Sequence, residues 1–295
     1  MLRNDSQINM NLSGVFVSGS HEDGSVVHRL EDIGLEVGPG EWLNLVGVNG
    51  SGKSTLARLL AGIHLVGVGG VIERGFAGDD VSPIVLQQPQ AQLFGETPRE
   101  EIQFALEWRG VEPESMQSRI QHILSATGLS AFADKAWDQL SGGQQQLAAI
   151  AASAACEAPL MVLDEVTSML DEANRQVVLQ IVKDLHKNGT TIIWVTQRLD
   201  ELDPDARTAA LAGGRLVFNG TARSFLFGDG DLISPCEQCG LRLPYMAAMA
   251  IELRRLGRLR DPLPVSPAEW ERALASLGPA VVQSAEKHGE FIERG

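Results

Sequence analysis

Residues 47–54 read Gly-Val-Asn-Gly-Ser-Gly-Lys-Ser, which is the pattern G-x-x-x-x-G-K-[ST]. An apolar run from Trp42 to Val46 precedes it and predicts a buried strand, and a run of good helix formers with Gly62 at its end follows it. A glycine loop between a strand and a helix is the context in which this pattern forms a P-loop. The alternative is a glycine-rich turn with a chance Gly-Lys-Ser, and the flanking segments disfavour it.

A P-loop binds a polyphosphate through inward-facing backbone N–H groups and the positive end of the helix that follows. Lys53 is expected to reach the β- and γ-phosphates, and Ser54 to hold Mg²⁺. The predicted nucleotide-binding residues of this loop are Asn49, Gly50, Ser51, Gly52, Lys53, Ser54 and Thr55.

Two later segments carry further chemistry. Leu160-Met-Val-Leu-Asp164-Glu165 predicts a buried strand that ends in two carboxylates. Asp164 is placed to bind Mg²⁺, and Glu165 to orient or deprotonate the attacking water. The earlier segment, Leu140-Ser-Gly-Gly-Gln144, taken alone is a helix capping box, because Ser-x-x-Gln precedes a helical run.

The order of P-loop, Leu-Ser-Gly-Gly-Gln and apolar-Asp-Glu resembles that of the ATP-binding cassette (ABC) ATPases. The resemblance implies that the chain binds ATP and Mg²⁺ and hydrolyses ATP. It also implies that the signature segment closes over the γ-phosphate held by a second subunit. The signature residues are Ser141, Gly142, Gly143 and Gln144.

Three more segments are similar to the ATPases of energy-coupling factor (ECF) transporters, which take up vitamins or transition-metal ions. Residues 85–94, Val-Leu-Gln-Gln-Pro-Gln-Ala-Gln-Leu-Phe, resemble the Q-loop, which implies a catalytic and Mg²⁺-binding role for Gln87. Residues 167–171 resemble the D-loop, and residues 240–257 resemble the extra C-terminal segment.

The ECF resemblance implies three partners: an integral-membrane coupling subunit, a substrate-binding membrane subunit and a second ABC ATPase. It places the protein peripherally on the cytoplasmic face of the membrane.

The composition fits this expectation. The 295 residues are 44% apolar, contain no apolar stretch of membrane-spanning length and begin without a signal-peptide pattern. The net charge of −14 disfavours nucleic acid as a partner.

The fold class expected is α/β, a P-loop NTPase of the ABC type with an antiparallel β subdomain. Residues 1–227 are expected to form the ATP-binding domain, with a helical signature subdomain over about 90–157. Within it, Thr97-Pro-Arg-Glu100 predicts a capping box at a helix start. Residues 228–295 are expected to form a C-terminal helical extension, interpreted as a dimerisation element, with packing on its own sheet as the alternative.

Four positions depart from the family pattern. Gln197 follows the strand that should lead to the switch histidine, and glutamine cannot take up a proton near neutral pH. Gly19 stands where a tyrosine usually stacks on adenine, so Phe16 or His28 is a candidate substitute. Val166 replaces a proline and Leu147 an arginine.

An impaired P-loop site beside an intact signature favours a heterodimer with one strong and one weak site, with a homodimer as the alternative. Two other functions remain open. One is an ATPase of a non-ECF ABC transporter, and the other is a dimerising, nucleotide-gated subunit with little hydrolysis. The pair Cys236 and Cys239 is interpreted as chance or as mildly redox-sensitive, with metal binding as the alternative.

Overall fold

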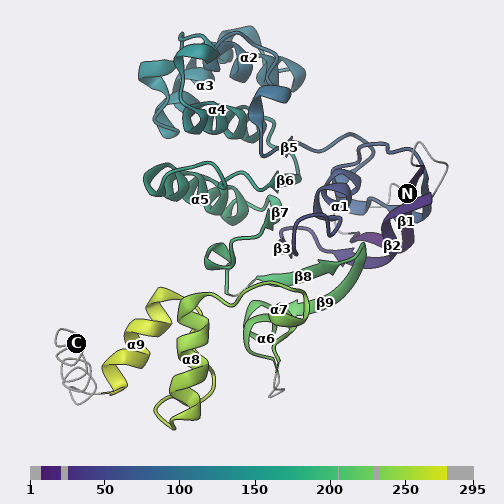
Figure 1. The fold of residues 1–295 in the computed structure, drawn as a ribbon. Helices are drawn as coiled ribbons and strands as arrows, with labels where there is room; N and C mark the ends of the chain where they lie inside the picture. Colours follow the sequence, from purple (N-terminus) through teal and green to yellow (C-terminus); the bar gives the residue numbers. More distant parts are fainter. Residues whose placement is uncertain (1–7, 21–25, 205, 229–232, 278–295) are drawn as a thin grey trace. The chain divides into compact units, whose positions relative to one another are not determined.

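The computed structural model describes residues 8–20, 26–204, 206–228 and 233–277 (Figure 1). The chain divides into two compact units. The first consists of residues 1–197 and 207–219, and the second of residues 198–206 and 220–295. The second unit therefore begins before the boundary at residue 227 that the composition suggests, and it also includes a short segment from the middle of the chain.

Two sheets build the first unit. The smaller sheet is antiparallel, with the order β2 (Val26–Val37), β1 (Met10–Ser20), β4 (Val68–Glu73). The larger has the order β5 (Ile84–Val85), β6 (Leu160–Asp164), β7 (Thr191–Thr196), β3 (Trp42–Val46), β8 (Arg207–Ala212), β9 (Arg215–Thr221). Its pairs from β5 to β8 are parallel. The expected antiparallel subdomain is thus built from β1, β2 and β4, and β3 belongs to the parallel part of the larger sheet.

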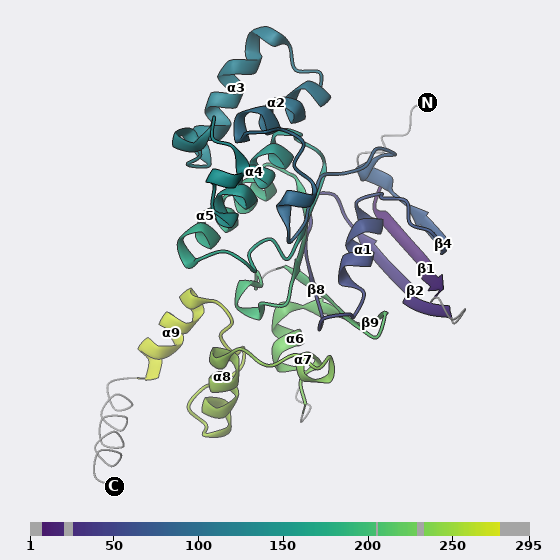
Figure 2. The ribbon, with the colours of Figure 1, turned by 45° about the horizontal axis from the view of Figure 1, so that its top comes forward.

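Continuous apolar runs explain why β3, β6 and β7 lie inside the larger sheet. Every residue of these three strands is buried, as expected for parallel strands that are covered on both faces. Figure 2 shows α1 (Lys53–Leu60) beside the smaller sheet. Its buried side chains, Leu56 and Leu60, pack in one core with Leu43, Leu45 and Ile193 of the larger sheet.

The helical subdomain predicted for about 90–157 contains α2 (Pro98–Trp108), α3 (Pro113–Ala126) and α4 (Gly142–Ala155), and α5 (Glu172–Lys187) precedes β7. Short 3₁₀ turns connect the longer elements. They span Gly75–Ala77, Pro89–Ala91, Ser130–Phe132, Trp137–Gln139 and Leu199–Glu201.

The helix start at Thr97 differs from the predicted capping box. The Thr97 hydroxyl accepts the Glu100 N–H at 3.3 Å, as expected. The Glu100 carboxylate, however, accepts the N–H of Glu96 at 2.8 Å. Glu101, one residue later, accepts the N–H groups of Phe94 and Gly95, each at 2.8 Å. The two glutamates therefore hold the chain that precedes the helix rather than closing a capping box.

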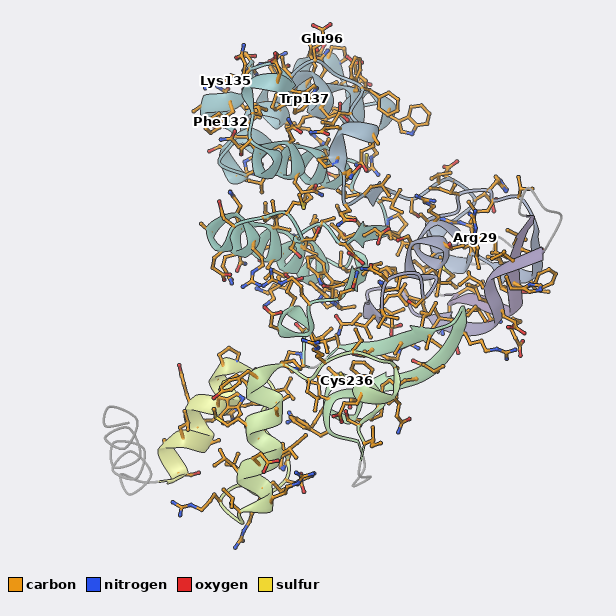
Figure 3. The ribbon with its side chains drawn as sticks, in the orientation of Figure 1. Arg29, Glu96, Phe132, Lys135, Trp137 and Cys236 are labelled. Carbon is orange, nitrogen blue, oxygen red and sulfur yellow. The ribbon has the colours of Figure 1, made fainter. Side chains whose placement is uncertain are left out.

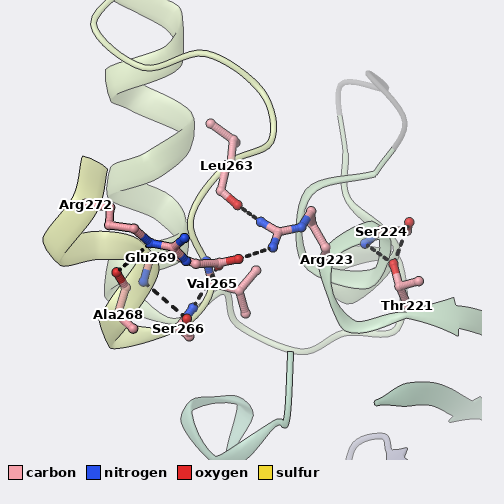
Figure 4. A network of polar contacts seen from close by, with 9 residues as sticks. All are labelled: Thr221, Arg223, Ser224, Leu263, Val265, Ser266, Ala268, Glu269 and Arg272. Carbon is pink, nitrogen blue, oxygen red and sulfur yellow. Dashed lines mark hydrogen bonds and ion pairs between the residues drawn. The ribbon is translucent and has the colours of Figure 1, made fainter. Parts of the chain in front are cut away.

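The second unit is helical in its described part, with α6 (Ala222–Phe227), α7 (Pro235–Gln238), α8 (Tyr245–Arg255) and α9 (Pro267–Leu277). A capping box begins α9, because the Glu269 N–H donates to the Ser266 hydroxyl and the Ser266 N–H donates to the Glu269 carboxylate. Glu269 also accepts from Arg223 of α6 at 2.6 Å and from the Val265 N–H at 2.7 Å (Figure 4).

No helix in the described ranges is long and apolar enough to cross a membrane.

Replacing Glu269 with Gln should destabilise the second unit. Burial by itself would raise the pKa of Glu269, but the Val265 N–H, Arg223 and the Ser266 N–H together hold it below the ordinary value of 4.5. A depressed pKa means that this carboxylate stabilises the fold above pH 4.5 and loses that effect as the pH falls through its folded pKa. We expect Glu269→Gln to cost about 1–3 kcal/mol at pH 7.

Thermal unfolding, followed by circular dichroism at pH 7 and at pH 3, measures this effect. The difference between wild type and variant should shrink at the lower pH. Glu271→Gln, an exposed position on the same helix, is the matched control and should unfold like the wild type. Equal effects of the two substitutions at pH 7 would show that the carboxylate of Glu269 is not what joins α6 to α9.

Candidate functional site

The order of the parallel strands brings the predicted site residues to one edge of the larger sheet. The strands β6, β7 and β3 are consecutive neighbours, so their carboxyl ends lie side by side. The P-loop follows β3, Asp164 and Glu165 stand at the end of β6, and Gln197 follows β7. Ligand sites of open α/β sheets lie at this edge.

The P-loop backbone requires glycine at two positions. Gly47 has φ 151°, and a side chain there would come within 2.4 Å of the Leu211 carbonyl and 2.5 Å of the Ser51 hydroxyl. Gly52 has φ 105°, and a side chain there would come within 2.8 Å of the Arg29 carbonyl on β2. The loop is therefore packed between β8 and β2, which holds its backbone in a fixed shape.

Lys53 is buried at the start of α1, and its ammonium group is held on several sides. Nζ donates to the carbonyls of Gly47 at 2.9 Å and Val48 at 3.1 Å. It also lies 3.4 Å from Oε1 of Glu165. A buried ammonium needs such partners. The pairing shows that the predicted phosphate-binding cation and the predicted water-orienting carboxylate share one small space.

Gln197 completes this cluster. Its Nε2 donates to Oε1 of Glu165 at 2.6 Å and to Oδ1 of Asn49 in the P-loop at 2.7 Å. Glu165 itself has φ 53°, a left-handed conformation that is uncommon for residues other than glycine. Its N–H donates to the Val195 carbonyl of β7, so backbone and side chain together aim this carboxylate at the P-loop.

Asp164 and Ser54 fit a magnesium site with bound nucleotide. Burial raises the pKa of Asp164, an effect that the neighbouring Ser54 hydroxyl opposes and Glu165 strengthens. Oδ1 of Asp164 is buried without a hydrogen-bond partner among the described residues, as is the hydroxyl of Ser51. A carboxylate oxygen with free acceptor capacity beside a serine hydroxyl is a donor set that Mg²⁺ prefers. When bound, Mg²⁺ would neutralise the charge of the terminal phosphates.

The signature residues form a second group on the helical subdomain. Ser141 is exposed at the start of α4, and its hydroxyl accepts the Gln144 N–H at 3.3 Å. The Gln144 side chain in turn accepts the Ser141 N–H at 2.9 Å. The capping box is thus present, and it holds the serine at an exposed helix N-terminus. Gly143 packs against Asn174 of α5, where a side chain would meet Nδ2 at 3.2 Å.

Gln87 is connected to the backbone of Glu165 through Ser168. Its Nε2 donates to the Ser168 hydroxyl at 3.2 Å, and that hydroxyl donates to the Glu165 carbonyl at 2.8 Å. Gln87 is exposed. Two hydrogen bonds through Ser168 therefore connect Gln87 of the predicted Q-loop with the carbonyl of Glu165, the residue that follows Asp164.

The positions that depart from the family pattern are accommodated differently. Val166 and Leu147 are buried, so both act as core residues. The ring of Phe16 lies on Gly69 of β4, where a side chain would come within 2.2 Å of it. His28 is exposed and adjoins Arg29, whose carbonyl contacts the P-loop at Gly52.

Cys236, which Figure 3 labels, and Cys239 are buried in the second unit. Burial raises the pKa of Cys236 to about 12 and also raises that of Cys239. Thiols with raised pKa are poor nucleophiles and poor metal ligands. No cluster of three or more metal-binding side chains occurs in the described part of the chain.

Comparison with known proteins identifies the family. The model of the ABC transporter family matches residues 30–168. The ECF transporter ATP-binding protein EcfA1 of Streptococcus thermophilus is 34% identical over 239 residues, which cover 78% of this chain and 85% of that protein. EcfA of Methanosarcina acetivorans is 34% identical over 250 residues, which cover 82% and 89%. The chain belongs to the ABC ATPases of the ECF type.

Solved structures agree with this assignment. The chain resembles cbiO1 from Clostridium perfringens, described as part of the ABC transporter complex cbiONQ, with a TM-score of 0.61 and 25% identity over 81% of this chain and 97% of that one. It resembles the dimeric ABC transporter cassette MJ0796 with a TM-score of 0.63 and 25% identity over 73% and 100%. As an ABC ATPase, the protein binds nucleotide and hydrolyses ATP for transport.

Lys53→Ala should weaken the binding of Mg-ATP by about 10- to 100-fold, because a charged hydrogen bond to phosphate contributes about 1.5–3 kcal/mol. Isothermal calorimetry measures the affinity, and circular dichroism verifies the fold. Lys183→Ala, an exposed position on α5, is the control and should bind as the wild type does. An unchanged affinity in a folded Lys53→Ala protein would refute the assignment of Lys53 to the terminal phosphates.

Proposed function

We propose that the chain is the weaker half of an asymmetric ATPase pair in an ECF-type importer, which takes up a vitamin or a transition-metal ion through separate membrane subunits. The observation that carries the asymmetry is the contact of Gln197 with Glu165 and Asn49. The membrane complex is supported by the names of the relatives and by the cbiONQ complex to which cbiO1 belongs.

Gln197 reproduces the position of the switch residue without its chemistry. Its amide orients the Glu165 carboxylate through one hydrogen bond of 2.6 Å. The carboxamide has no titration near neutral pH, so it cannot gain positive charge as negative charge builds on the transferring phosphate. Loss of one such charged stabiliser typically costs roughly 10²- to 10³-fold in rate. Hydrolysis at the P-loop of this chain is therefore slow.

The signature segment of the same chain retains all of its expected residues, Ser141 to Gln144. Ser141 is exposed and held by a complete capping box. In an ABC pair this signature acts on the nucleotide bound to the other subunit. The second subunit of such a pair would then carry the stronger P-loop site, and this chain would serve that site in trans.

An exposed face of the helical subdomain suits a membrane subunit. Phe94, which precedes α2, is 87% exposed, and Trp108 and Phe104 of α2 are 90% and 48% exposed. Glu96 projects from this subdomain (Figure 3), and Glu100 is exposed one turn further on. Aromatic side chains beside carboxylates favour a partner helix that carries both apolar and basic residues. Peripheral attachment to the cytoplasmic face follows from this contact.

The C-terminal unit is proposed as the dimerisation element. In the described part of that unit, Tyr245 and Leu256 at the two ends of α8 are 77% and 71% exposed, and Leu274 of α9 is 52% exposed. Exposed apolar residues on adjacent helices are typical of surfaces that a partner covers. We assign this surface to contact with the second ATPase subunit.

Substitutions confined to this chain distinguish a heterodimer from a homodimer. In the co-expressed complex, Ser141→Arg should nearly abolish ATPase activity, because it blocks the signature that serves the stronger site. Lys53→Ala should cost much less, because it disables a site that is already slow. Gln197→His should raise turnover at this chain's own site by roughly tenfold, equivalent to about 1.4 kcal/mol of barrier, and therefore the total turnover of the pair by no more than about twofold. Equal losses from Ser141→Arg and Lys53→Ala would reject the asymmetric pair.

Charge reversal tests the proposed membrane contact. Glu100→Lys should reduce the amount of protein recovered with membranes by roughly tenfold while ATP affinity stays unchanged, because buried charge pairs at interfaces commonly contribute more than 1 kcal/mol. Glu101 is less suitable for this test, because it is buried and accepts two backbone N–H groups, whereas Glu100 is exposed and accepts only that of Glu96. Glu114→Lys on α3 is the matched control. Recovery of Glu100→Lys at the control's level would place the contact on another surface.

A further inference from the structure

Two buried glutamines follow the signature on α4. Gln145 and Gln146 are 6% and 3% exposed, and the next residues of the helix, Leu147 to Ala152, are apolar and buried. A buried carboxamide costs free energy unless its polar atoms are hydrogen-bonded. The partners of these two side chains are therefore a fixed part of the structure.

Gln145 connects the signature loop with the segment that follows Gln87. Its Nε2 donates to the carbonyls of Trp137 at 2.6 Å and Leu140 at 3.3 Å. Leu140 directly precedes Ser141. The Oε1 atom of Gln145 accepts from Nε2 of Gln90 at 2.9 Å. One side chain thus spans from the residue before the signature serine to the Q-loop.

Two further hydrogen bonds run beside this link. Gln146 donates to the Leu86 carbonyl at 3.1 Å. The indole N–H of Trp137 donates to the Gly95 carbonyl at 2.5 Å. Segment 86–95 is therefore attached to α4 and to the turn before the signature at both of its ends, while its Phe94 side chain stays exposed.

We propose that Gln145 is a positioning residue that couples segment 86–95 to Ser141. Displacement of segment 86–95 by the membrane subunit moves the Leu140 carbonyl, and with it the signature serine, through Gln90 and Gln145. Because this signature acts on nucleotide held by the other subunit, the signal runs in trans. The coupling rests on the proposed function in one respect, namely that the membrane subunit contacts this segment.

The contacts of Gln145 with the signature loop and its contact with Gln90 can be tested separately. Gln145→Met keeps the size of the side chain and removes all three hydrogen bonds. It should lower kcat of the isolated ATPase pair roughly three- to tenfold, with little change in the KM for Mg-ATP, because the signature loop loses its support. Gln145→Glu, which keeps the acceptor and loses the donors to Trp137 and Leu140, should do the same.

Gln90 is exposed, so Gln90→Met removes only its hydrogen bond to Gln145 and leaves the contacts of Gln145 with Trp137 and Leu140 in place. It should leave kcat of the isolated pair unchanged. It should lower the ratio of ATPase activity in the complete membrane complex to that of the isolated pair by roughly three- to tenfold. The double variant should have the same ratio as Gln145→Met alone, because both changes interrupt one path.

Thr127→Val is the matched control. Its hydroxyl is buried in the same subdomain and donates to the Ile123 carbonyl at 2.8 Å. Both kcat and the ratio should stay at wild-type values.

If Gln145→Met has no more effect on kcat than Thr127→Val, the positioning role is wrong. If the effects of Gln90→Met and Gln145→Met on the ratio multiply, the path through Gln145 is wrong. A wild-type complex without any co-purifying membrane subunit would instead refute the proposed function, and the kcat comparison would still test Gln145.

Discussion

The order β6–β7–β3 in the parallel sheet is the constraint on which the site depends. Three segments that are far apart in the sequence meet at the ends of adjacent strands, so Glu165 comes within ion-pair distance of Lys53 and within hydrogen-bonding distance of Gln197. A different strand order would leave the same motifs intact and separate their side chains. Complete burial of the three strands makes this order expensive to change.

The cluster at this edge also suggests how the site responds to nucleotide. Lys53 is paired with Glu165 in the structure. The terminal phosphates of ATP carry more negative charge than one carboxylate, so they would compete for the same ammonium group. Glu165 would then be left to Gln197, which already donates to it, and to the attacking water. The amide of Gln197 thus fixes where this carboxylate points but supplies no charge to the reaction.

Sequence patterns predicted the chemical groups of the site more completely than the hydrogen bonds that connect the surrounding segments. The P-loop, Asp164 and Glu165 are recognisable because their roles require particular residue types at fixed spacing, and the apolar runs before them predict buried strands. The structural role of Glu101 could not be predicted, since it depends on how the chain turns at Phe94 and Gly95. The same holds for Gln145, whose neighbours Trp137 and Gln90 are brought to it only by the packing of the helical subdomain. The available signal was the run of three glutamines, Gln144 to Gln146, at the start of a largely apolar helix.

The central claim is that the two ATP sites of the pair differ because Gln197 stands in only one of them. A single-turnover experiment measures this most directly: both sites of the purified pair are filled with ATP in the absence of Mg²⁺, unbound ATP is removed, and hydrolysis is started with Mg²⁺ and quenched with acid. The account predicts a fast phase of about one ADP per pair and a much slower second phase, since single-turnover kinetics separate chemistry from binding and release. A single fast phase of about two ADP per pair would contradict it.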